Sequence, residues 1–142
     1  EKALDLFNSM ENYGLLPDLI TFSAAISACR KGGQWDMALD LFDSMKDCGV
    51  KPDFAIFKAA VSACEKCGKW EKAVKLLDSI KDYGLQPDTI TFNVVISACE
   101  KGEQWVKALD LFYSMEDYGL QPDVITFNAV IGACEKGGQW KR

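Results

Sequence analysis

Six cysteines are the residues of this chain with the most evident capacity for chemistry. Cys64 and Cys67 form a C-x-x-C motif, a spacing that serves thiol–disulfide exchange or zinc binding in other proteins. No second C-x-x-C motif accompanies it, and the chain contains no His, so the commonest metal ligand and general base is missing. The sequence therefore predicts neither a metal centre nor a redox site.

Four of the cysteines recur at intervals of 35 residues, at Cys29, Cys64, Cys99 and Cys134. If each interval is a pair of helices, successive cysteines lie roughly 20 Å apart, because packed helices are separated by about 8–10 Å. A disulfide requires Cα atoms within about 7 Å of each other. We interpret these cysteines as small buried side chains in a reducing compartment.

The composition narrows the classes of function. Of the 142 residues, 49% are hydrophobic and 26% are charged, which is ordinary for a globular domain. No nucleophile–base pair or phosphate-binding loop is recognisable, so we expect no enzymatic activity and no cofactor. No apolar run approaches the roughly 18 residues of a membrane span. The net charge of -5 argues mildly against a nucleic acid as partner.

The same interval of 35 residues runs through the whole chain. Pro-Asp pairs, tryptophans and glycines all repeat at this interval. The Pro-Asp pairs are Pro17-Asp18, Pro52-Asp53, Pro87-Asp88 and Pro122-Asp123. Division after each Asp gives full units at 19–53, 54–88 and 89–123, with partial units at 1–18 and 124–142. We therefore expect residues 1–142 to form a single repeat array, and we expect this array to be a segment of a longer protein.

Each unit has the periodicity of two helices. In unit 19–53 the apolar residues Phe22, Ala25, Ile26 and Cys29 fall on one helical face, and the Gly32-Gly33 pair then ends this first helix. A second helix follows, with apolar residues at Ala38, Leu39, Phe42 and Met45 and acidic residues on its opposite face at Asp36, Asp40, Asp43 and Asp47. Gly49 is expected to end it in a left-handed conformation.

Neither helix can bury its apolar stripe alone, so neighbouring units must stack. The sequence predicts an all-α fold, an α-solenoid of stacked helix-turn-helix repeats. The aromatic residues that keep the interval are interpreted as core residues: Phe22, Phe57, Phe92, Phe127, Trp35, Trp70, Trp105 and Trp140.

The repeat resembles the pentatricopeptide repeat family in its 35-residue form. The similarity is close at Ile90-Thr91-Phe92-Asn93, at Ala108-Leu109-Asp110-Leu111-Phe112, and from Met115 to Gly119-Leu120-Gln121-Pro122-Asp123. The resemblance implies a right-handed superhelix that binds single-stranded RNA sequence-selectively. It also implies a role in RNA processing, stability, editing or translation in mitochondria or chloroplasts.

Family members read about one base per repeat, through the fifth residue of the unit and the Asp that closes it. The resemblance implies the pairs Ser23 with Asp53, Lys58 with Asp88, and Asn93 with Asp123, together with Asn128 and Asp18 as half-pairs. By the family's code Asn93 with Asp123 implies uracil, and the donors and acceptor of an amide can match a pyrimidine edge. Ser23 with Asp53 implies a purine, with guanine preferred. Lys58 departs from the family pattern, and its base is left unassigned.

Two further sets follow from the resemblance. Apolar residues that would wedge each base between neighbouring repeats are Ile20, Ala55, Ile90 and Ile125. Lysines that would contact the phosphate chain are Lys31, Lys66, Lys101 and Lys136. A plainer interpretation of these lysines is that they offset the dipole at the end of the first helix.

Charge is segregated along the unit, which weakens the argument against RNA. Segments 19–29, 89–99 and 124–134 carry no charged residue, whereas the acidic residues lie mainly on the second helices. Glu65, Glu100 and Glu135 nevertheless stand beside the proposed phosphate-binding lysines, so we expect weak, salt-sensitive binding. The alternative is a scaffold that binds peptides or proteins, and incomplete units at both ends predict self-association.

Overall fold

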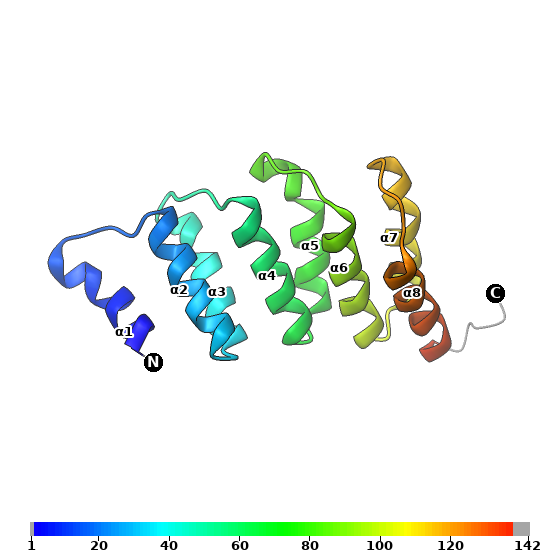
Figure 1. Ribbon diagram of the computed structural model, residues 1–142, viewed down its shortest axis with the longest axis horizontal. Coiled ribbons are helices and arrows are strands. Elements are labelled where there is room, and N and C mark those ends of the chain that lie inside the picture. The colour runs from blue at the N-terminus through cyan, green and yellow to red at the C-terminus, as the bar shows by residue number, and fades with distance from the viewer. Residues whose placement is uncertain (1, 138–142) are drawn as a thin grey trace. The chain divides into compact units, whose positions relative to one another are not determined.

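The computed structural model describes residues 2–137, and within this range all regular structure is helical (Figure 1). The α-helices are α1 Lys2–Ser9, α2 Leu19–Lys31, α3 Trp35–Asp47, α4 Phe54–Lys66, α5 Trp70–Asp78, α6 Thr89–Lys101, α7 Trp105–Asp117 and α8 Val124–Lys136. Two short 3₁₀ helices, η1 Met10–Tyr13 and η2 Ile80–Tyr83, extend α1 and α5.

The Pro-Asp pairs begin the first helices at the predicted positions. Asp18, Asp88 and Asp123 each have extended backbone and accept the backbone N–H three residues later, at 2.9, 2.8 and 3.0 Å. Asp53 makes the same bond to the N–H of Ile56, at 2.9 Å. A carboxylate in this position satisfies a helix N–H that would otherwise lack a partner. Gly49 follows α3 with φ of 70°, which confirms the predicted left-handed stop.

The chain divides into two compact units, Glu1–Ala63 and Cys64–Arg142. In the N-terminal unit α2 packs against both α1 and α3. Two aromatic pairs join its helices, Phe7 with Phe22 at 5.1 Å between ring centroids and Phe42 with Phe57 at 6.4 Å. In each pair, a ring of one second helix meets the ring of the following first helix.

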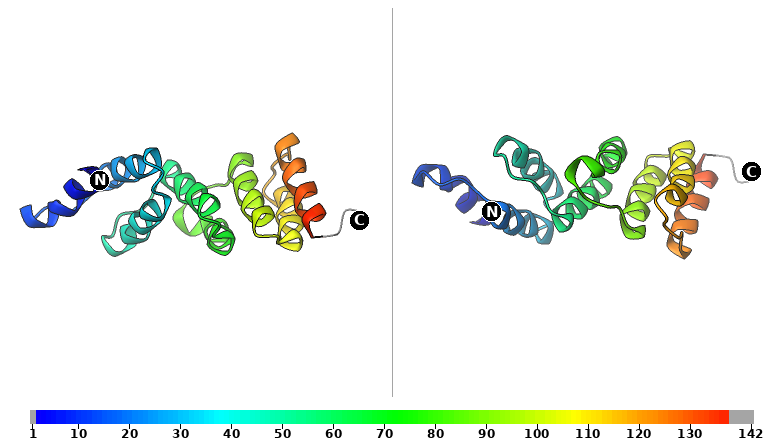
Figure 2. Two further views of the ribbon diagram at one scale, coloured as in Figure 1. Left: turned by 90° about the horizontal axis from the view of Figure 1, so that it is seen from below. Right: turned by 90° about the horizontal axis from the view of Figure 1, so that it is seen from above.

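In the C-terminal unit α6 contacts α5, α7 and α8, and α7 also contacts α8. Figure 2 shows α6, α7 and α8 side by side in two directions of view. Phe92 of α6 lies against Tyr118 after α7, and Phe112 of α7 lies against Phe127 of α8, at 5.4 and 5.1 Å. Hairpins stacked in this way are the building plan of an α-solenoid, and the predicted all-α fold class is confirmed.

Three of the four predicted core phenylalanines are buried, and one is not. Phe22, Phe57 and Phe92 are 0, 0 and 1% exposed, whereas Phe127 is 48% exposed. The prediction for Phe127 was wrong because no helix after α8 packs on its outer side within residues 2–137. The ring of Phe92, by contrast, is covered by the ring of Tyr118.

The tryptophans pack against glycines of the next hairpin. A Cβ built on Gly102 would lie 2.4 Å from Cδ1 of Trp70, and one on Gly137 would lie 2.1 Å from Cδ1 of Trp105. These two rings are therefore packing elements, as predicted, and each occupies space that a larger residue would need. Trp140 lies outside the described residues.

Three of the four cysteines that keep the 35-residue interval are buried, as interpreted from the sequence. Cys29, Cys64 and Cys99 are buried, whereas Cys134 is half-buried. Burial raises the pKa of Cys99 to about 11, so this thiol stays protonated at neutral pH. No group of residues suited to a metal ion occurs between residues 2 and 137. No helix in that range is long and apolar enough to cross a membrane.

Helix α8 presents an apolar surface, and we predict that it drives self-association. Val124, Ile125, Phe127 and Ile131 are between 48 and 74% exposed on this single helix. Contiguous exposed apolar surface favours association. Light scattering should show a molar mass that rises with protein concentration, and Ile131→Asp should suppress this rise. A monodisperse monomer at high concentration would contradict this expectation.

Candidate functional site

The C-terminal unit brings together the predicted pair Asn93 and Asp123. Asn93 lies in the second turn of α6, Asp123 caps α8, and the amide Nδ2 donates to Asp123 Oδ1 at 3.0 Å. The Thr126 hydroxyl donates to the other end of the amide, Asn93 Oδ1. Two residues 30 positions apart in the sequence thus form one polar cluster between successive first helices.

Asn93 is less accessible than the predicted base-reading role suggests. Its exposed fraction is 7%, because its amide is held by Asp123 and Thr126 of the next repeat. Its partner Asp123 is exposed. The backbone N–H and the hydroxyl of Thr126, together with the Asn93 amide, lie within hydrogen-bond distance of the Asp123 carboxyl and lower its pKa. It is therefore ionised at neutral pH.

The N-terminal unit contains the second predicted pair, Ser23 and Asp53. Both residues are exposed, and Asp53 Oδ1 accepts the N–H of Ile56 at 2.9 Å. No hydrogen bond joins Ser23 to Asp53 in the part of the chain that the structure describes. Ser23 and Asp53 therefore differ from Asn93 and Asp123, whose side chains are hydrogen-bonded to each other.

The remaining predicted base-reading residues are described singly. The Lys58 ammonium lies 5.3 Å from the centroid of the Phe54 ring, in the N-terminal unit. Asp88, in the C-terminal unit, accepts the N–H and the hydroxyl of Thr91 at 2.8 and 2.6 Å. Asn128 on α8 is exposed. Asp18 caps α2, and its bonds to the backbone and hydroxyl of Thr21 lower its pKa.

The residues predicted to wedge bases are accessible at all four positions. Ile20, Ile90 and Ile125 are 78, 58 and 63% exposed, and Ala55 is also exposed. Ile90 and Asn93 share one face of α6 because they are three residues apart. An apolar side chain and the polar cluster thus neighbour each other.

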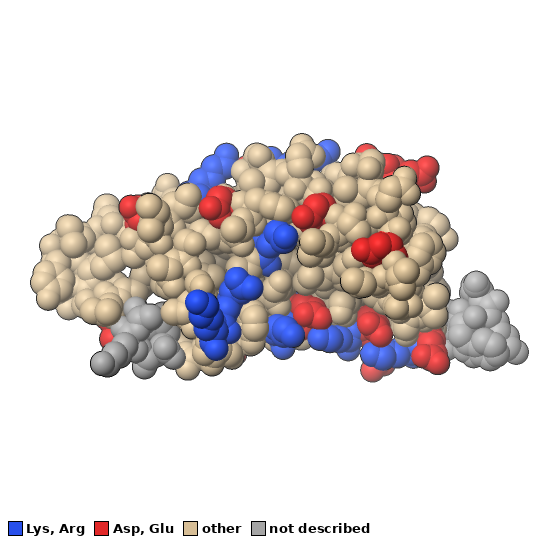
Figure 3. Space-filling view, viewed as in Figure 1, with Lys and Arg blue, Asp and Glu red and all other residues tan. Residues whose placement is uncertain are grey.

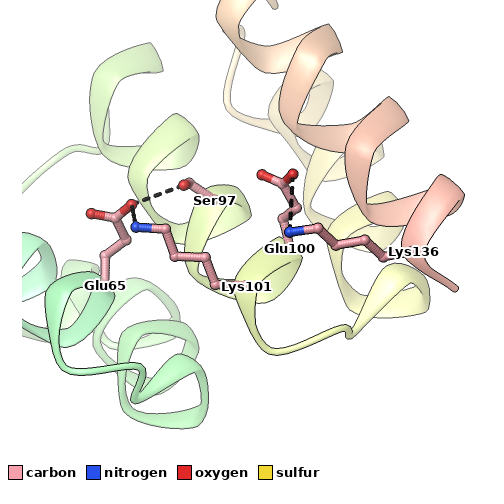
Figure 4. Close-up of polar contacts among 5 residues, drawn as sticks. All are labelled: Glu65, Ser97, Glu100, Lys101 and Lys136. Atoms are coloured by element: carbon pink, nitrogen blue, oxygen red, sulfur yellow. Dashed lines mark hydrogen bonds and ion pairs between the residues drawn. The ribbon is translucent and has the colours of Figure 1, made fainter.

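Two of the four predicted phosphate-binding lysines are paired with glutamates of the preceding repeat. Lys101 Nζ lies 2.8 Å from Glu65 Oε2, which also accepts a 2.9 Å hydrogen bond from Ser97 (Figure 4). Lys136 Nζ lies 3.6 Å from Glu100 Oε2. Lys31 and Lys66 are exposed. Two lysines are thus held by carboxylates in the structure.

Because of these ion pairs, the surface at the ends of the first helices carries both charges and is not purely basic. Figure 3 shows basic and acidic side chains alternating where α6 and α8 end. Partial burial alone would raise the pKa of Glu65, but hydrogen bonds from Lys101 and Ser97 and the charge of Lys101 lower it below 4.5. Glu65 is therefore ionised at neutral pH, and its partly buried position strengthens the attraction to Lys101.

The sequence predicted the helix caps and the apolar residues. It did not predict that Thr126 would contact Asn93, or that Glu65 would bind Lys101 and Ser97. The signal for Thr126 was its place in the Thr-Phe pair, three residues after Asp123. The signal for Glu65 was the recurrence of Glu 36 residues before Lys, at Glu65 and Lys101 and again at Glu100 and Lys136. Stacked repeats bring such residues together.

The repeats and the fold of this chain are similar to those of known proteins. The PPR repeat family model matches residues 55–101 and 88–136, and a PPR repeat model matches residues 20–50. The maize pentatricopeptide repeat protein PPR10 is similar in structure, with a TM-score of 0.74 and 25% identity over 92% of this chain. PPR10 in complex with an 18-nt psaJ RNA element matches with a TM-score of 0.69 and 28% identity over 99% of this chain.

The chain spans only 18 and 20% of those two PPR10 chains. The PPR domain of Arabidopsis thaliana protein-only RNase P 1, solved with tRNA, has a TM-score of 0.81 and 16% identity. That match covers 99% of this chain and 77% of that chain, and it shows the same fold. No curated protein sequence matches the chain. The family model covers more than half of the sequence, and the chain therefore belongs to the PPR repeat family.

Proposed function

We propose that this chain binds single-stranded RNA, with side chains of successive repeats meeting about one base each. The observation that carries the proposal is the Asn93–Asp123 pair, a polar cluster between neighbouring first helices beside the exposed Ile90. Membership of the PPR repeat family and similarity to PPR10 in its complex with RNA support it.

The proposed base preferences differ between repeats. Asn93 with Asp123 favours uracil by the family's code, and the amide keeps a donor and an acceptor lone pair for a pyrimidine edge after its bonds to Asp123 and Thr126. Ser23 with Asp53 favours a purine, with guanine preferred. Lys58 and Asp88 have no assigned base, and Asn128 and Asp18 contribute as half-pairs. Ile20, Ala55, Ile90 and Ile125 contact the faces of the bases.

The RNA backbone would follow the lysines at the ends of the first helices. Lys31 and Lys66 are exposed there. Lys101 and Lys136 must exchange Glu65 and Glu100 for phosphate, so their contribution is reduced. Each phosphate contact on a single strand lowers the slope of the logarithm of the binding constant against the logarithm of salt concentration by about 0.7. We therefore expect binding that is salt-sensitive, and weak because two of the lysines are paired.

The proposal extends to the setting of the whole protein. We assign the array no catalytic role, in keeping with a sequence that holds no His. We place the protein in a mitochondrion or chloroplast, in RNA processing, stability, editing or translation. A peptide-binding scaffold is the competing function.

Fluorescence anisotropy with labelled unstructured RNA tests the proposal. Binding should be salt-dependent, stronger for single strands than for duplex, and competed by unlabelled RNA. Competition by apolar peptides but not by RNA would favour the scaffold instead. Absence of RNA binding at low salt would refute the proposed function.

Removal of the Glu65 charge should strengthen RNA binding. Glu65→Gln keeps a hydrogen-bond acceptor for Ser97 but releases the Lys101 ammonium from its carboxylate. One additional phosphate contact should steepen the salt slope by about 0.7, as measured by anisotropy over a range of salt concentrations.

Glu135→Gln is the matched control for this substitution. Glu135 occupies the equivalent position on α8, is exposed, and forms no ion pair among residues 2–137. Both variants change the net charge equally, so a purely long-range effect would be the same in each. Equal salt slopes for the two variants would show that Lys101 is not the residue released.

A further inference from the structure

The polar cluster contains a residue that the base-reading scheme does not use, Thr126. This side chain is 0% exposed and stands at the third position of the repeat that follows Asn93. Its Oγ1 accepts the backbone N–H of Asp123 at 3.1 Å and donates to Asn93 Oδ1. A hydroxyl with no access to water is thus placed directly against the proposed base-reading amide.

The chemistry of the cluster permits only one orientation of that amide. The ionised Asp123 carboxylate can only accept hydrogen bonds, so the end of Asn93 that faces it must be the NH₂ group. The other end, Oδ1, then faces Thr126 and requires a donor. The Thr126 hydroxyl has one proton, and its acceptor side is already used by the N–H of Asp123. The hydroxyl proton is therefore available to Asn93 Oδ1.

Asp123 Oδ1 also lies within reach of that proton, at 3.0 Å from Thr126 Oγ1. However, this oxygen already accepts the N–H of Thr126 at 3.0 Å and the NH₂ of Asn93 at 3.0 Å. Asn93 Oδ1 has no other donor among the described residues. The hydroxyl thus supplies the bond that Asn93 would otherwise lack in a buried setting, where an unpaired polar atom is costly.

We propose that Thr126 is a positioning residue that fixes the amide orientation of Asn93 and thereby the base preference of this repeat. With Thr126 in place, one N–H and one lone pair of Asn93 remain for a base, in a fixed arrangement. Without the hydroxyl, the amide can rotate and present several arrangements. The inference rests on the proposed RNA binding for its consequence, but the positioning itself can be measured on the free protein.

The N-terminal unit offers an internal contrast. There, Ile56 stands at the third position after Asp53, where the other repeats have Thr21, Thr91 and Thr126. Asp53 accepts the N–H of Ile56 at 2.9 Å, and Ser23 is exposed. This repeat, with Ser in place of Asn and Ile in place of Thr, keeps its helix cap but does not form the closed cluster. The helix cap therefore forms without the threonine hydroxyl.

The test compares Thr126→Val, which removes the hydroxyl at nearly constant volume, with Thr126→Ser, which restores it. Binding of each variant is measured with short unstructured RNAs that differ at one nucleotide. Thr126→Val should lose about threefold to tenfold of its discrimination between uracil and a purine at one position, the value of one hydrogen bond. Thr126→Ser should recover it. Loss of affinity without loss of discrimination would overturn the inference.

Thr91→Val is the matched control. Thr91 has the same position one repeat earlier and donates to Asp88 at 2.6 Å, but the fifth residue of the repeat that precedes it is Lys58 rather than Asn. This variant should leave the preference set by Asn93 unchanged. If it weakens discrimination as much as Thr126→Val does, the effect of Thr126 is general and the inference fails.

NMR of the free chain separates this inference from the proposed function. The two protons on Asn93 Nδ2 should give distinct, slowly exchanging signals in the wild type and in Thr126→Ser. In Thr126→Val they should shift and exchange faster with water. Unchanged Asn93 signals would overturn the positioning role, whether or not RNA binds. If Thr126→Val does not fold, Thr126→Ala provides the same comparison. Absence of RNA binding by the wild type, with the NMR shift present, would refute only the proposed function.

Discussion

Replacement of Phe92 by Ala should lower the free energy of unfolding of the C-terminal unit by about 3–5 kcal/mol. Phe92 is 1% exposed, and its ring lies 5.4 Å from that of Tyr118. Truncation leaves a cavity at the point where α6 meets its own second helix. Urea unfolding followed by circular dichroism measures the change.

Phe127→Ala is the natural control for this result. Phe127 has the same position in the next repeat and also packs against one ring, Phe112, but it is 48% exposed. Its truncation removes less buried surface and leaves an open notch rather than a cavity, so the loss should be less than half as large. Equal losses would contradict the stacking of hairpins described here.

Replacement of Asn93 by Ser should shift the preference at one base from pyrimidine towards purine, by roughly tenfold. Serine offers one hydroxyl in place of the amide, and its shorter side chain gives up the bonds to Asp123 and Thr126. The exchange makes this repeat like the one that contains Ser23 and Asp53. Binding of RNAs that vary at one nucleotide measures the shift.

Asn128→Ser serves as the control for Asn93→Ser. Asn128 is the fifth residue of the next repeat and is exposed. Its substitution should leave the base met by Asn93 unaffected. If both variants, or neither, change the preference at that position, the assignment of Asn93 is wrong.

The sequence predicted most of the features that a single repeat determines. The start of each first helix followed from Pro-Asp, because proline stops one helix and the Asp carboxylate caps the next. The buried positions of Phe22, Phe57 and Phe92 followed from helical spacing within one unit. The acidic residues Asp36 and Asp40 lie on the exposed side of α3, as predicted.

Features that depend on two repeats were harder to predict. Glu65 stands beside Lys66 in the sequence, but its carboxylate binds Lys101 of the next repeat. Asn93 was expected to be accessible, and it is mostly covered because residues 30 and 33 positions later close over it. Such contacts depend on the exact offset between stacked helices, which apolar periodicity does not specify.

Selection of bound sequences from a random RNA pool tests the central claim most directly, that successive repeats meet successive bases. The chain and its Asn93→Ser variant are used in parallel. The account predicts an enriched RNA motif in which uracil at one position is replaced by a purine in the variant, while neighbouring positions stay the same. Identical motifs for the two proteins, or no enriched motif from either, would contradict it.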